Sequence, residues 1–153
     1  MPKIIISDTS CFILLTNIGE LDLLHKVYNQ VVTTVDIATE FGETLPEWVE
    51  IVPVKNTSRQ EILELELDKG ESSAIALALE TPGSLIILDD YKARKIAQRL
   101  HITFTGTVGV IIKAKRIGLI PSVKPFLEKI KETNFRLSVE LEHLVLKEAN
   151  ELG

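Results

Sequence analysis

The sequence is poor in the features on which secreted and membrane-spanning proteins depend. Its only cysteine, Cys11, has no partner for a disulfide within the chain, so a reducing cytoplasm is the expected compartment. No apolar run approaches the roughly 20 residues that a membrane-spanning helix needs. The first residues, MPKIIIS, hold one lysine and an apolar run too short for a signal peptide. We therefore expect a cytoplasmic protein without a membrane partner.

Positive charge and aromatic rings are also scarce. Seventeen lysines and arginines stand against 22 aspartates and glutamates, which gives a formal net charge of −5. This balance argues against a protein that coats duplex nucleic acid through a broad basic surface. It leaves open an enzyme that holds nucleic acid through metal ions, because divalent cations neutralise the acidic pocket that binds them. With Trp48 as the only tryptophan, few rings remain for stacking on bases.

Several common active-site motifs are missing. His25, His101 and His143 are widely spaced and Cys11 is alone, so a zinc site is not expected. The segment GTVG at 106–109 lacks the spacing and the lysine of a phosphate-binding P-loop. No nucleophile elbow is present, although spacing alone leaves a Ser–His–Asp triad open.

What the chain does contain is an alternation of short apolar runs with helical stretches over 153 residues. The expected strands cover 3–7, 30–33, 48–55, 85–88 and 102–106, and Pro53 places the third of them at an edge. The expected helices include 34–42, ending at Gly42, and 59–70, stopped by Gly70. This pattern predicts a three-layer α/β/α fold around a parallel sheet of about four or five strands. We expect one domain over 1–153, with the helices of about 121–153 packed on it.

Carboxylates follow two of the buried strands. Asp8 comes directly after the first, and Asp89 and Asp90 come after residues 85–88. In open parallel sheets, function gathers outside the carboxyl ends of the strands. Taken singly, each aspartate is better explained by capping the following helix. Asp90 also has Arg94 four residues on, the spacing of a surface ion pair.

Two glutamates on helices are further candidates. Glu71 lies three and four residues before the apolar stripe of its helix, so we expect its side chain on the core-facing side of the first turn. An inward carboxylate needs a partner, and a cation is the simplest one. Glu40 borders the apolar face of residues 34–42, where a solvated rim position is an equal interpretation, and Asp36 one turn earlier is its alternative.

Carboxylates gathered at one edge would raise one another's pKa values and destabilise the fold near neutral pH. A hard divalent cation, Mg²⁺ or Mn²⁺, removes this repulsion, and Asp8, Glu71, Asp89 and Asp90 are its expected ligands. Such metals activate water and assist displacement at phosphorus.

Four segments, taken together, resemble the PIN-domain nucleases, and most closely their small stand-alone prokaryotic branch. They are IISDTS at 5–10, GESSAIALALE at 70–80, LIILDDYKARKIA at 85–97 and TGTVGVIIKAKRIGLI at 105–120. The resemblance runs from residue 4 to about 120, with the last helices matching more loosely. It implies a Mg²⁺- or Mn²⁺-dependent endoribonuclease, often the toxin of a toxin–antitoxin pair, on a parallel α/β sheet.

The resemblance also assigns roles by position. It implies that Asp8 is the first-strand metal ligand, supported by Ser10, and that Glu40 is the helix glutamate of the family. Glu71 falls where many members carry aspartate, and Asp90 best matches the fourth acid. The catalytic set implied in this way is Asp8, Glu40, Glu71 and Asp90, with Asp89 as a close neighbour.

One position departs from the family pattern. Many members have threonine or serine two residues before the fourth acid, where this chain has Leu88. The missing polar support is then supplied by Thr105 or Thr107, or it is absent. The departure bears on catalytic strength more than on fold.

The hypothesis that follows is hydrolysis of single-stranded RNA by a metal-bound water, leaving 5′-phosphate and 3′-hydroxyl ends. The basic residues placed to meet backbone phosphates are Lys92, Arg94, Lys113, Lys115 and Arg116, although for most of them a solvated helix face is the better interpretation. Partners other than RNA are an antitoxin or a second copy, because the last helix carries an apolar set that fits its own domain, a dimer or an antitoxin groove.

Two alternatives stay open. The first is a PIN-like module that binds RNA or a protein with weak or no catalysis, which Leu88 and the uncertain Glu40 favour. The second is a metal-dependent phosphatase or phospho-acceptor domain, which would want a second aspartate two residues after Asp8. Ser10 stands there instead and weakens this alternative.

Overall fold

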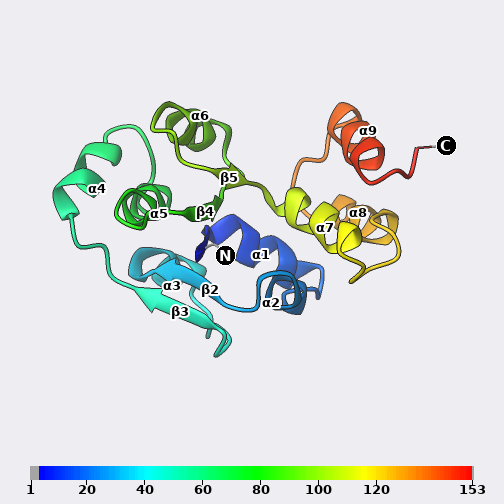
Figure 1. The fold of residues 1–153 in the computed structure, drawn as a ribbon, viewed down its shortest axis with the longest axis horizontal. Helices are drawn as coiled ribbons and strands as arrows, with labels where there is room; N and C mark the ends of the chain where they lie inside the picture. Colours follow the sequence, from blue (N-terminus) through cyan, green and yellow to red (C-terminus); the bar gives the residue numbers. More distant parts are fainter. Residues whose placement is uncertain (1–3, 153) are drawn as a thin grey trace.

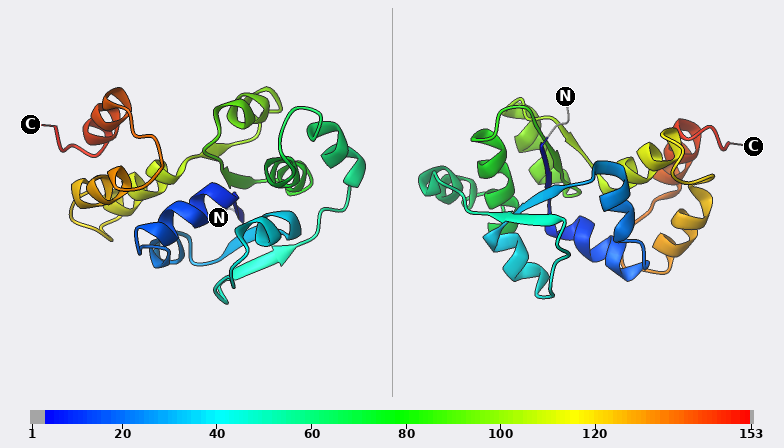
Figure 2. Two further views of the ribbon diagram at one scale, coloured as in Figure 1. Left: turned by 180° about the vertical axis from the view of Figure 1, so that it is seen from behind. Right: turned by 60° about the horizontal axis from the view of Figure 1, so that its bottom comes forward.

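A sheet of five parallel strands forms the centre of the molecule in the computed structural model, which describes residues 4–152. The strands are β1 (Ile4–Ser7), β2 (Val31–Thr34), β3 (Val49–Val52), β4 (Ser84–Ile87) and β5 (Phe104–Thr105). Their order across the sheet is β3-β2-β1-β4-β5, and every neighbouring pair is parallel. Helices lie on both sides of the strands (Figures 1 and 2), so the predicted three-layer α/β/α fold is confirmed.

Nine helices are present between residues 4 and 152. They are α1 (Thr9–Asn17), α2 (Asp22–Tyr28), α3 (Val35–Phe41), α4 (Thr57–Leu63), α5 (Lys69–Leu79), α6 (Tyr91–Arg99), α7 (Thr107–Arg116), α8 (Lys124–Lys131) and α9 (Val139–Glu148). Within the same range, no helix has both the length and the apolar character needed to cross a bilayer. Helices α3 and α4 pack on α5, whereas α1 and α2 pack on α7.

The central pair of strands explains where the chain leaves the sheet. In β1 and β4 the apolar runs are covered on both faces, so Ile6 and Ile86 are fully buried, as parallel strands require. Their register places Ser7 opposite Ile87. Asp8 and Leu88, the next residue of each strand, therefore leave the sheet at the same edge.

The predicted end of a helix at Gly42 is confirmed, whereas the predicted end at Gly70 is wrong. Helix α3 ends where Gly42 adopts a left-handed conformation, with φ of 75°, as expected for a C-cap glycine. By contrast, α4 ends at Leu63, and Gly70 is the second residue of α5 rather than a stop. The physical reason is Asp68, whose side chain accepts the Glu71 N–H and starts a new helix there.

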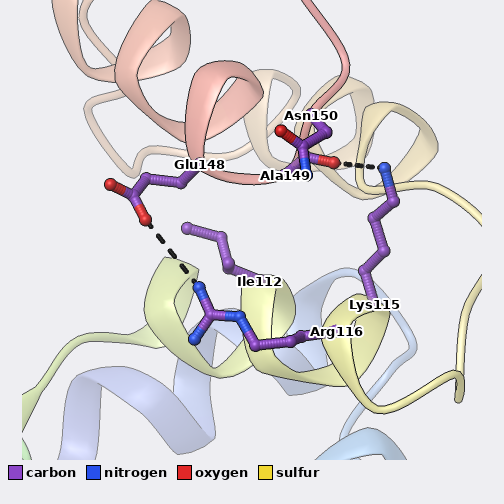
Figure 3. A pocket seen from close by; sticks show the side chains of 6 residues that line it. All are labelled: Ile112, Lys115, Arg116, Glu148, Ala149 and Asn150. Carbon is purple, nitrogen blue, oxygen red and sulfur yellow. Dashed lines mark hydrogen bonds and ion pairs between the residues drawn. The ribbon is translucent and has the colours of Figure 1, made fainter.

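A buried carboxylate attaches the end of the chain to α7 and α8. Glu151, with its side chain 8% exposed, accepts hydrogen bonds from the Ser122 hydroxyl at 2.6 Å and the Val123 N–H at 2.8 Å, and it pairs with Lys115 Nζ at 2.9 Å. Burial alone would raise the pKa of Glu151, but these donors outweigh it and lower that pKa from 4.5 to about 2. Lys115 also donates to the carbonyl of Ala149, as Figure 3 shows.

This clamp predicts a measurable contribution to stability. Glu151→Gln is expected to lower the free energy of unfolding by about 2 kcal/mol at pH 7, the range for hydrogen bonds to a charged group. Because the folded pKa lies below the ordinary value, the contribution is present above about pH 4.5 and is lost as the pH falls towards 2. Urea unfolding of both proteins at several pH values measures it.

Glu148→Gln is the matched control. Glu148 pairs with Arg116 of the same helix α7, but at 3.8 Å and with both side chains 65% exposed (Figure 3). An exposed pair of this kind contributes less than about 1 kcal/mol. Equal effects of the two substitutions would show that the Glu151 contacts add nothing beyond surface electrostatics.

Candidate functional site

Asp8 joins the ends of the two central strands. Its Oδ1 accepts the Cys11 N–H at 2.9 Å, so Asp8 caps α1, one of the roles expected for it. Its Oδ2 accepts the Asp89 N–H at 3.0 Å, across the sheet at the end of β4. With 3% of its surface exposed, Asp8 is held from two sides and is almost fully buried.

The surroundings of Asp8 oppose its negative charge. Burial has the largest effect and raises the pKa of Asp8 well above its ordinary value, and the charges of Asp89 and Glu71 raise it further. The two backbone N–H donors act in the opposite direction but do not compensate. Among residues 4–152, none of the ion pairs involves one of the five acids Asp8, Glu40, Glu71, Asp89 and Asp90. No lysine or arginine therefore pairs directly with these five acids, although the Arg94 guanidinium and the Asp89 carboxylate lie on the same side of Gly106.

The adjacent aspartates after β4 have separate contacts. Asp90 is exposed, and its Oδ2 caps α6 by accepting the Ala93 N–H at 2.9 Å. Asp89 is half-buried and accepts both the Thr107 N–H at 2.8 Å and the Thr107 hydroxyl at 2.5 Å. Asp89 thus connects the end of β4 to the start of α7, and Thr107 is placed to support it.

Leu88 has no polar function at this edge. Its side chain is fully buried, and its backbone N–H donates to the Thr105 carbonyl at 2.8 Å. Its carbonyl accepts Arg94 Nε at 2.7 Å, and the Arg94 guanidinium lies 5.1 Å from the centre of the Phe104 ring. The side chain of Thr105 packs against Gly109. Of the two threonines expected to support the acids, Thr107 is the one that bonds to a carboxylate.

Glu71 occupies the first turn of α5, where the sequence predicts it. Burial has the largest effect on the pKa of Glu71, and the charges of Asp68 and Asp90 add to it. Together they raise this pKa from 4.5 to about 7. Asp68 was not among the predicted site residues. The spacing Asp-x-x-Glu, which resembles the capping box of a helix start, is the signal that could have found it.

Glu40 reaches the start of α5 from the last turn of α3. A Cβ atom added at Gly70 would lie 2.8 Å from Glu40 Oε1 and 3.4 Å from Thr9 Oγ1, so the glycine leaves the space in which these groups meet. Asp36, the alternative to Glu40, is engaged elsewhere. It accepts Gln60 Nε2 at 2.7 Å and lies 4.0 Å from Lys69.

Thr9 is a second residue that sequence reasoning missed. Its Oγ1 is buried and has no hydrogen-bond partner among residues 4–152. A buried hydroxyl without a partner carries an energetic penalty, and it is unusual in folded proteins. Nothing in the sequence distinguishes Thr9 from any other residue near a helix start, so only the three-dimensional arrangement identifies it.

The oxygen donors at this edge are of the type that binds a hard divalent cation, but the side chains that carry them lie too far apart to bind one together. Uncompensated carboxylates, the unpartnered Thr9 hydroxyl and the space above Gly70 all favour Mg²⁺ or Mn²⁺. However, no three Asp, Glu, His or Cys side chains of residues 4–152 are grouped closely enough to hold an ion. Cation binding therefore requires the movable side chains to rearrange.

The five basic residues predicted to meet RNA phosphates all have partners within the fold. Lys92 pairs with Glu66 at 3.1 Å, and Lys113 lies 4.7 Å from the centre of the Tyr28 ring. Arg94, Lys115 and Arg116 have the contacts given above. Lys113, Lys115 and Arg116 sit about 9–14 Å along α7 from Thr107, at 1.5 Å per residue. Arg94 is nearer to the acids, since a Cβ added at Gly106 would lie 2.6 Å from Arg94 Nη2 and 2.9 Å from Asp89 Oδ1. A role for these five residues in binding RNA stays a prediction.

A family model described as a PIN domain matches residues 4–151, nearly the whole chain and all of the carboxylates above. No curated protein matches the chain. No solved structure matches it either.

Titration of Glu71 predicts a stability that falls as the pH rises. Its pKa is higher in the folded protein than in the unfolded chain, so the folded state binds the extra proton between about pH 4.5 and 7. Without metal, Glu71→Gln is therefore expected to raise Tm relative to wild type at pH 8 and to give little difference below pH 4.5. Thermal melts across this range test it, with the exposed Glu61→Gln as a control that should show no such trend.

Gly70→Ala should separate the fold from the site. Alanine is favoured over glycine in a helix by about 0.5–1 kcal/mol, which offsets part of the strain of the close contact. Its methyl group would displace the Glu40 carboxylate, the flexible group in its way. We expect a Tm close to that of wild type and a smaller rise of Tm on adding Mn²⁺. An unchanged Mn²⁺ response would mean that Glu40 is not part of the cation site.

Proposed function

The chain belongs to the PIN-domain family, and from this premise we propose that it is a divalent-metal-dependent endoribonuclease acting on single-stranded RNA. PIN domains are generally nucleases, and they typically use divalent metals. The observation that carries the proposal is Asp8, a buried carboxylate whose pKa is raised by burial and by the neighbouring acids Asp89 and Glu71, and which pairs with no lysine or arginine among residues 4–152.

The residues that would hold the metal are Asp8, Glu71 and Asp90, with Glu40 and the Thr9 hydroxyl beside them. When bound, the metal would supply an activated water and would stabilise charge on the phosphate and on the leaving 3′ oxygen. The products would carry 5′-phosphate and 3′-hydroxyl ends.

The protein itself contributes position and proton exchange. Two backbone N–H groups fix Asp8, and the contacts of Asp89 with Thr107 hold the neighbouring strand end in place. Because burial and neighbouring acids raise the pKa values of Asp8 and Glu71, bringing a cation to them would release protons. Metal affinity should therefore increase with pH through neutrality.

A toxin role and an antitoxin partner are the further parts of this proposal, and family resemblance supports them. The apolar residues of α9 and its C-cap range from buried to exposed. Val145 and Ala149 are buried, whereas Leu144 is 56% exposed and Val139 is 82% exposed. Leu144 is the exposed member of the predicted apolar set, and a second copy or an antitoxin would contact α9 there.

A PIN-like module that binds RNA or protein without cleavage is the second candidate. Two observations favour it: the buried apolar Leu88 in place of a polar support, and the absence of a grouped ligand set among residues 4–152. Both candidates use the same surface, so they differ only in whether a bound phosphodiester is hydrolysed.

Cleavage of labelled single-stranded RNA by the purified protein tests the proposal. With Mn²⁺ or Mg²⁺ we expect cleavage that chelator abolishes and that Glu71→Gln and Asp90→Asn reduce on the order of 100-fold or more, beyond the loss typical of outer-sphere changes. Asp22→Asn is the matched control, because Asp22 is exposed on α2 and its ion pair is with Lys26. A denaturing gel, with end analysis of the products, gives the readout.

Asp8→Asn needs a stability measurement beside it. Both Asp8 oxygens accept backbone N–H groups, so an amide would direct its own donor at one of them. Cleavage that survives chelator or the Glu71 and Asp90 substitutions would contradict the nuclease proposal. Tight RNA binding without cleavage would favour the binding module.

A further inference from the structure

A pocket of about 210 Å³ runs along α1 from its first turn. One wall is a stripe of α1 that includes Ser10, Ile13 and Asn17, and the other is the segment between α8 and α9, with Asn134 and Phe135. One end of the pocket, at Ser10, therefore lies in the first turn of α1, the helix that Asp8 caps. At 1.5 Å per residue, the stripe extends about 10 Å along the helix.

The lining of this pocket is neutral. It contains no acidic or basic side chain. Ile13 is 43% exposed and Phe135 supplies an aromatic ring, so the pocket offers apolar surface. Asn17 and Asn134 are exposed, and within residues 4–152 neither side-chain amide forms a hydrogen bond. Such a lining suits a flat, uncharged group with hydrogen-bonding edges better than a phosphate or a metal.

The wall that carries Phe135 is held in shape by its own hydrogen bonds. The Thr133 hydroxyl donates to the Ile130 carbonyl at 2.6 Å and accepts the Phe135 N–H at 3.1 Å. This arrangement fixes the turn after α8 without using Asn134. A pocket wall ordered before binding lowers the entropic penalty of binding.

We propose that this pocket binds one nucleobase of a single-stranded RNA, next to the phosphate at the acidic edge. Ile13 and Phe135 would contact the faces of the base, and the amides of Asn17 and Asn134 would bond to its edge, as proteins read unpaired bases. The volume is below the roughly 300–1,000 Å³ typical of drug-sized ligand sites, which fits one base rather than two. The inference rests on the proposed ribonuclease function and names the part of the substrate that gives it base preference.

Binding of fluorescent single-stranded RNA tests the pocket separately from catalysis. Anisotropy titrations use the full chain with Ca²⁺, and oligonucleotides of each of the four bases. The protein variants are wild type, the double variant Asn17→Ala/Asn134→Ala, and Gln98→Ala, an exposed amide on α6, as the control. A further set of oligonucleotides carries one abasic nucleotide, moved along the chain, and needs no protein variant.

We expect wild type and Gln98→Ala to bind oligonucleotides of one base more tightly than the others. In the double variant this ratio of affinities should fall about tenfold, the effect of losing one good base contact. At one position, the abasic nucleotide should weaken RNA binding by wild type and leave RNA binding by the double variant unchanged. Unchanged base ratios in the double variant, or no base preference in wild type, would overturn the pocket assignment.

Cleavage assays on the same proteins separate the two proposals. If wild type cleaves RNA and the double variant keeps the same base preference, the ribonuclease proposal stands and the pocket assignment is wrong. If the protein does not cleave RNA but the double variant loses the base preference, the pocket assignment stands and the ribonuclease proposal is wrong. Thermal melting of each variant confirms that the substitutions leave the fold intact.

Discussion

The hydrogen bond from the Asp89 backbone to the Asp8 carboxylate is the contact on which the acidic edge depends. It joins residues 81 positions apart in the chain, and it does so at the ends of the two central strands. Helix α1 begins from the same carboxylate, and Asp89 in turn holds the start of α7 through Thr107. One buried carboxyl group therefore joins the ends of the two central strands to the start of α1, and through Asp89 to the start of α7.

This arrangement carries a conflict between folding and function. Burial and crowding of acids raise the pKa of Asp8 and bring the pKa of Glu71 to about 7. A chain selected for stability alone would replace some of these acids, since isolated buried charge is unfavourable. Their presence is explained if a cation offsets the repulsion between them. The proposed ribonuclease activity requires such a cation. The neutral pocket along α1 adds a different kind of recognition, for a base rather than a charge.

The sequence was sufficient for the elements with a strong local signal. Continuous apolar runs identified β1 and β4, Pro53 placed β3 at an edge, and Gly42 ended α3. The break between α4 and α5 was missed because a cap by Asp68, not a glycine, begins the new helix. The unpartnered hydroxyl of Thr9 and the partners of the basic residues could not be predicted from the sequence either. Contacts such as Lys115 with Glu151 join positions far apart in the chain, and they depend on packing that no local pattern encodes.

The two hydrogen bonds that fix Asp8 bear on the choice of metal. A cage of rigid ligands selects an ion by its radius, whereas ligands on flexible arms adapt to ions of different size. Here the Asp8 carboxylate is held by two backbone N–H groups and Asp90 by one, whereas Glu40 is an exposed side chain with no hydrogen bond among residues 4–152. In the proposed metal site, ligands that differ in mobility would discriminate among ions through oxygen chemistry and hydration rather than through cavity size. Ionic radius should therefore be a weak determinant of which hard divalent cation this edge accepts.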